Sequence, residues 1–165
     1  MLPRLGLTFC LYCPEARISV DDFSLAVDFA QVFEGGRSAL LLVHCESRYT
    51  CVRFDMSGLD WARLGEIAME EIRCGLLDAG IPEAQVEAYL AEAGDVEMTR
   101  THGRREVAFL NRAWEDVLAA DLLVEEDSHR QPLLNRMVNS RPCRCAGEEG
   151  LAAAQTHLEH YFARK

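Results

Sequence analysis

Hydrophobic and polar residues alternate with a period of two in much of the first third of the chain. This is the period of a β-strand, whose side chains point to opposite faces in turn. Short turns that contain glycine or polar residues separate the clearest stretches, and the first of these turns holds the pair Gly35 and Gly36. The pattern predicts an antiparallel β-meander. The alternating stretches are residues 27–33 and 49–55, with a weaker one at 4–9, and the apolar run of residues 38–44 lies between the first two.

The hydrophobic period changes to that of a helix from Leu59 onward. Asp60 is the expected N-cap of the first helix, and Gly80 is its expected stop. Pro82 suits the first turn of a second helix, because proline needs no hydrogen-bond partner there. Later positions predict a further strand and three further helices, at residues 95–101, 106–123, 128–140 and 148–164 respectively.

Strands come first along the chain and helices later, which favours an α+β fold over repeated βαβ units. We expect an antiparallel sheet of about four to five strands, with a central meander and helices packed mainly on one face. No internal repeat, low-complexity tract or linker is visible in the sequence. The sequence therefore predicts a single domain over 1–165, with a core at about 27–145 and a C-terminal helix at 146–165.

The charge of the chain excludes some classes of function. Against 17 basic residues stand 27 acidic ones, which gives a net charge of −10 and a pI near 4.9. This balance argues against nucleic-acid binding, which needs a basic face. No stretch approaches the roughly 18 consecutive apolar residues of a membrane helix, and the N-terminus lacks the features of a secretory signal. The expectation is a cytoplasmic protein that binds neither nucleic acid nor membrane.

The acidity is concentrated in one segment. Residues 57–99 hold ten acidic and two basic residues, a net charge of −8. Four arginines follow at the expected strand-to-helix turn, namely Arg100, Arg104, Arg105 and Arg112. The first hypothesis is a non-enzymatic interaction or accessory module that contacts another protein through the acidic helical face or this arginine-rich turn. No phosphate-binding loop, dinucleotide-binding motif or nucleophile elbow is present, so no catalytic residue is predicted.

An alternative hypothesis belongs to a different class of protein. Arginines at a helix start can bind an anion together with backbone N–H groups. A small-molecule or anion-binding protein, or an enzyme, would then use the turn with Thr101, Arg104, Arg105 and Asn111. Under the structural interpretation, the same arginines pair with the neighbouring acidic helices.

The cysteines suggest a third hypothesis. The chain has seven, an odd number that does not favour a full disulfide framework. Cys10 and Cys13 are separated by two residues, and Cys143 and Cys145 by one, so four thiolates could form a tetrahedral structural zinc site. The ordinary alternative is that these cysteines behave as small hydrophobic residues. His157 and His160 could also share a metal, although a C-terminal helix favours an exposed pair.

Three stretches of the chain together carry a resemblance to a known family of proteins. The first is Asp78-Ala-Gly-Ile-Pro-Glu83, and the second is Tyr89-Leu-Ala-Glu-Ala-Gly-Asp-Val-Glu-Met-Thr-Arg-Thr101. The third is the helix that holds Arg104 and Asn111, and a looser likeness lies at Leu133-Leu-Asn-Arg-Met-Val-Asn-Ser-Arg-Pro-Cys143. Together these stretches resemble a family of small bacterial proteins known only as a domain of unknown function, and the resemblance covers about residues 27–145.

Thr101, Arg104 and Asn111 stand where the family has Thr, Arg and Asn. The chain departs from the family pattern at His102, Arg105, Ala108-Phe109 and Arg112. The resemblance implies an α+β fold and a bacterial intracellular setting. It implies no reaction, cofactor or partner.

Overall fold

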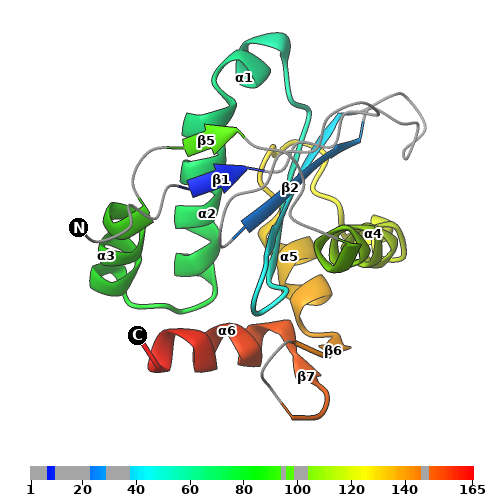
Figure 1. Cartoon of the computed structure of the whole chain (residues 1–165). Helices are drawn as coiled ribbons and strands as arrows, with labels where there is room; N and C mark the ends of the chain where they lie inside the picture. Colours follow the sequence, from blue (N-terminus) through cyan, green and yellow to red (C-terminus); the bar gives the residue numbers. More distant parts are fainter. Residues whose placement is uncertain (1–6, 10–22, 29–37, 94–95, 99–103, 146–148) are drawn as a thin grey trace.

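A three-stranded antiparallel sheet lies at the centre of the computed structural model (Figure 1). The strand order is β2 (Phe23–Asp28), β3 (Ala39–His44) and β4 (Thr50–Phe54). A three-stranded meander is therefore present. β3 and β4 lie close to the expected 38–44 and 49–55, whereas β2 begins before the expected 27–33, most of which lies outside the described residues. The structure describes residues 7–9, 23–28, 38–93, 96–98, 104–145 and 149–165.

Two further pairs of strands lie outside this sheet. β1 (Leu7–Phe9) pairs in parallel with β5 (Val96–Met98), and β6 (Pro142–Cys143) pairs antiparallel with β7 (Ala152–Ala153). The fold mixes helices and strands as an α+β protein does. Within the described residues, however, the central sheet has three strands where the sequence predicted four or five.

Local sequence signals mark where the first helix begins, near residue 60, and where the next one ends, at residue 80. Ser57, and not the predicted Asp60, is the N-cap, and Asp60 completes a capping box by bonding back to the Ser57 backbone. Gly80 ends the next helix with φ of 83°, which a glycine adopts without strain. The helices are α1 (Gly58–Ala62), α2 (Leu64–Asp78), α3 (Glu83–Ala93), α4 (Arg104–Leu118), the 3₁₀ turn η1 (Asp121–Leu123), α5 (Pro132–Asn139) and α6 (Ala154–Ala163). Among the described residues, none of these helices is long and apolar enough to cross a membrane.

Helices cover both faces of the central sheet, so the expectation of helices mainly on one face is wrong. Leu40 and Leu42 of β3 pack in a cluster with α2, α3 and α6. Ala39, Leu41 and Val43 point the other way and pack with α4 and α5. Every residue of β3 is buried. A strand that is apolar at consecutive positions requires cover on both faces, and this uninterrupted run was the signal in the sequence.

The outer edge of β4 is covered by asparagine side chains of α5. The Asn139 amide accepts a bond from the Thr50 N–H and donates one to the Thr50 carbonyl, each at 2.7 Å. The Asn135 oxygen accepts from the Val52 N–H at 2.9 Å. Residues four apart on a helix are about 6 Å apart, close to the spacing of residues two apart on a strand. The two asparagines thus satisfy the open edge of the sheet and fix α5 against it.

Candidate metal centre

The segment after α5 places two cysteines and a histidine together. Cys143 lies on β6, opposite Ala152 of β7, and α6 begins directly after β7 at Ala154. This short return brings His157, in the first turn of α6, back to Cys143. Figure 1 shows the β6–β7 pair beside the start of α6.

Three potential ligand atoms of this segment lie within 4.8 Å of one another. They are the sulfurs of Cys143 and Cys145 and one ring nitrogen of His157. In a tetrahedral zinc site with bonds of about 2.0–2.3 Å, ligand atoms are about 3.5–3.8 Å apart. Small side-chain rotations would therefore close the three atoms around one ion.

The His157 ring is oriented by a backbone contact. Its Nε2 lies 3.1 Å from the Cys143 carbonyl oxygen, which can only accept, so Nε2 carries the proton. The Nδ1 atom then holds a lone pair. Nδ1 is buried without a hydrogen-bond partner in the described part of the chain, and the residue is 3% exposed. A buried polar atom without a partner is costly and requires an explanation.

Local contacts favour the thiolate form of Cys143. They lower its pKa to about 6, chiefly through the hydrogen bond from the Cys145 thiol and further through the positive charge of Arg48. Partial burial and the carboxylate of Asp116 act in the opposite direction. The thiolate is the form that attacks electrophiles and binds metal ions.

We expect Cys143 to be alkylated by iodoacetamide with a half-maximal rate near pH 6. Burial and a hydrogen bond to Glu70 raise the pKa of Cys74, which makes it an internal reference. Peptide mapping by mass spectrometry, after brief exposure of reduced and chelator-treated protein, measures both rates. The pH at which the Cys143 rate is half-maximal should rise in Cys145→Ala, because this variant lacks the thiol that donates a hydrogen bond to Cys143. A Cys143 midpoint no lower than that of Cys74 would contradict the assignment.

Comparison with known proteins places the chain in a family. Residues 30–153 match the model of the family described as Domain of unknown function (DUF6933). The chain belongs to the DUF6933 family. The predicted resemblance to a domain of unknown function is thereby confirmed. No curated protein and no solved structure matches the chain.

The DUF6933 match includes only part of the candidate metal centre. Cys143 and Cys145 lie inside the matched residues, and His157 lies four residues beyond the end of the match. The cluster of candidate ligands therefore depends on α6 as well as on the DUF6933 region.

The structure describes half of the predicted four-cysteine zinc site. It brings Cys143 and Cys145 together with His157, whereas Cys10 and Cys13 lie outside the described residues. The complete four-cysteine site stays a prediction.

The predicted anion site at the start of α4 is described only in part. Arg104, Arg105 and Asn111 are exposed on α4, and Thr101 lies outside the described residues. The Arg105 guanidinium is 5.9 Å from the centre of the Phe109 ring. A role of this turn in binding a ligand or a partner protein stays a prediction.

His157 was not singled out by the sequence as a buried ligand. The sequence predicted that His157 and His160 form an exposed pair on the last helix. His160 is exposed as predicted, but the prediction is wrong for His157, which is buried. A signal was present: His157 is three residues after Ala154 and four before Tyr161, and both are buried. Its spacing places it on the apolar face of α6.

Proposed function

We propose that this protein binds one zinc ion through Cys143, Cys145 and His157. The observation that carries the proposal is the cluster of two thiols with a ring nitrogen of His157, whose Nδ1 is buried and has no hydrogen-bond partner among the described residues. Two thiolates and a neutral imidazole are ligands that zinc prefers, and they leave the centre without net charge.

The hydrogen bond at the other ring nitrogen supports the proposal. Metal-binding histidines usually donate their second N–H to a carbonyl or carboxylate, which fixes the tautomer and the ring orientation. The bond from His157 Nε2 to the Cys143 carbonyl has this form. Without a metal ion, no hydrogen bond from the described residues offsets the free-energy cost of burying Nδ1 away from water.

Three protein ligands leave one position of a tetrahedral zinc ion to be filled. Cys10 or Cys13 would complete a structural site of three cysteines and one histidine. A water molecule in that position would instead make the site an open one, as in zinc enzymes. Both versions of the site use Cys143, Cys145 and His157. They differ in whether replacing Cys10 and Cys13 weakens zinc binding.

We expect protein purified under reducing conditions without added metal to contain close to one equivalent of zinc. Elemental analysis measures the content, and competition with a chromophoric chelator measures the affinity. Cobalt substitution should give the absorption of a tetrahedral thiolate site. The variants Cys143→Ala and Cys145→Ala should each lose the metal, because each removes one of three ligands. Cys10→Ala and Cys13→Ala should weaken binding only if either residue is the fourth ligand.

Cys74→Ala is the matched control, since Cys74 is a half-buried thiol of α2 that bonds to Glu70. It should retain zinc fully. His157→Ala is measured alongside its thermal unfolding, because the side chain is buried. Zinc below a tenth of an equivalent, together with no cobalt spectrum after reconstitution, would overturn the proposal. Equal retention of metal in Cys143→Ala, Cys145→Ala and Cys74→Ala would do the same.

A further inference from the structure

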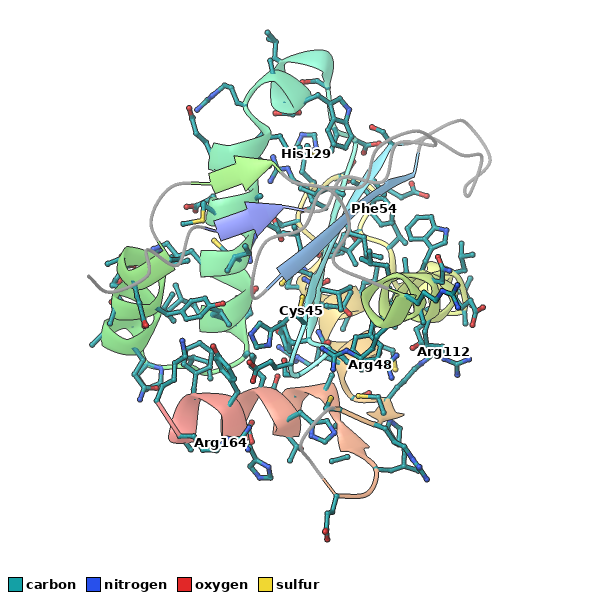
Figure 2. All side chains as sticks on the ribbon, in the orientation of Figure 1. Cys45, Arg48, Phe54, Arg112, His129 and Arg164 are labelled. Carbon is teal, nitrogen blue, oxygen red and sulfur yellow. The ribbon has the colours of Figure 1, made fainter. Side chains whose placement is uncertain are left out.

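A small pocket lies directly beside Cys143. It has a volume of about 50 Å³ and lies between the β3–β4 turn, α4 and the segment that follows α5. Figure 2 shows two of its side chains, Arg48 from the β3–β4 turn and Arg112 from α4, on the same side of the molecule. The volume is that of roughly three to five water molecules, which is also about the room needed by one phosphate group.

Positive charge dominates the walls of the pocket. Arg48, Arg112 and Arg141 line it together with one carboxylate, that of Asp116, and the Cys143 thiol, so the guanidinium groups outnumber the acidic groups. Asp116 Oδ1 accepts a bond from Arg141 Nη1 at 2.7 Å and lies 3.8 Å from Arg112 Nε. Arg112 Nη1 also donates a bond to Glu115 Oε2 at 3.2 Å, and the remaining N–H groups of Arg112 and Arg141 are available to an anion.

Arg48 differs from the other two arginines because no carboxylate in the described part of the chain pairs with it. Its guanidinium lies 4.5 Å from the centre of the Phe109 ring, and its Nη1 is 3.5 Å from the Arg144 carbonyl oxygen. The Arg48 backbone has φ of 62°, which is uncommon for a residue with a side chain. Such strained positions concentrate at functional sites. The contact with the Phe109 ring and the backbone conformation of the β3–β4 turn together hold the Arg48 guanidinium at the pocket.

We infer that the pocket of Arg48, Arg112 and Arg141 binds a phosphate group, either as free phosphate or as the head of a small phosphomonoester. Guanidinium groups bind phosphate oxygens with paired, charge-assisted hydrogen bonds, which a pocket of this size and charge permits. The inference goes beyond zinc binding. It rests on three arginines that are not metal ligands, and Cys143 is the one residue that the two sites share.

The test is a calorimetric titration of the full chain with inorganic phosphate and, in a second arm, with glycerol phosphate. Each ligand is titrated into zinc-loaded and into chelator-treated protein, so that failure of the metal proposal does not obscure the result. We expect saturable binding in at least one preparation. Stronger binding of glycerol phosphate would identify a phosphomonoester as the ligand, and stronger binding of inorganic phosphate would identify the free ion.

Two variants test the assignment to this pocket. Arg48→Asn removes the charge with a residue that tolerates positive φ, and Arg112→Gln removes the second cation. Each should weaken binding about tenfold or more. The control is Arg63→Gln, because Arg63 and Arg112 are equally exposed, at 68% and 63%, and each pairs with a glutamate three residues later.

Arg63→Gln should bind phosphate as the unmodified protein does. The inference is overturned if neither preparation binds either ligand saturably. It is equally overturned if Arg48→Asn and Arg112→Gln, shown by circular dichroism to be folded, bind as tightly as Arg63→Gln.

Discussion

Replacing Asn139 by alanine is expected to lower the free energy of unfolding by about 2–6 kcal/mol. The side chain makes two hydrogen bonds of 2.7 Å to the N–H and carbonyl of Thr50, at an edge where both residues are buried. Alanine leaves both backbone groups without a partner. Each buried group left in this state costs about 1–3 kcal/mol.

Urea unfolding, followed by tryptophan fluorescence and circular dichroism, measures the change. Asn111→Ala is the matched control, because Asn111 is an exposed asparagine inside helix α4. It should be neutral or slightly stabilising, since alanine has the higher helix propensity. Asn135→Ala should fall between the two, because its side chain accepts one bond, from the Val52 N–H. Equal stabilities of Asn139→Ala and Asn111→Ala would show that α5 does not depend on this contact.

The asparagines illustrate what the sequence did and did not predict about the fold. The strand positions at β3 and β4 and the helix break at Gly80 were predictable, because hydrophobic period and glycine conformation are local properties. The pairing of Asn135 and Asn139 with β4 is not local. It joins residues 83 and 89 positions apart in the chain. Asn-x-x-x-Asn on a helix becomes informative only when the helix is known to lie along a strand edge.

In the candidate site, too, contacts between residues close in sequence were predictable, and contacts between distant residues were not. The spacing of Cys143 and Cys145 made it predictable that their thiols lie close together, as they do, and their role as zinc ligands stays a proposal. His157 joins them because β7 returns the chain to β6 before α6 begins. Strands of two residues give almost no sequence signal, so this return was not predicted. The Arg48 side of the phosphate pocket likewise comes from a turn 95 positions before Cys143, by the difference of their numbers.

A second large loss of stability is expected when Gly75 is replaced by alanine. Gly75 is buried in α2, where it packs against β4, and an alanine Cβ there would lie 2.3 Å from the sulfur of Cys51. Atoms do not approach so closely, so the helix or the strand must move. Cys51 is 1% exposed and has no space to rotate into solvent. Overpacking of this kind costs about 1–3 kcal/mol, more than the roughly 1 kcal/mol that alanine gains in helix propensity.

The double variant Cys51→Ala/Gly75→Ala separates this clash from a general need for glycine. Removing the sulfur leaves the Cys51 Cβ at 3.7 Å and Tyr49 Cε1 at 3.8 Å as the nearest atoms, both ordinary contacts. The double variant should therefore be more stable than Gly75→Ala alone, even though Cys51→Ala by itself removes a buried group and destabilises. Urea unfolding of the four proteins gives the coupling free energy, expected at about 1–3 kcal/mol in favour of the double variant. A coupling free energy near zero would mean that α2 accommodates the added methyl group at Gly75 without a clash with β4. The short distance between helix and strand would then not restrict which residue can occupy this position.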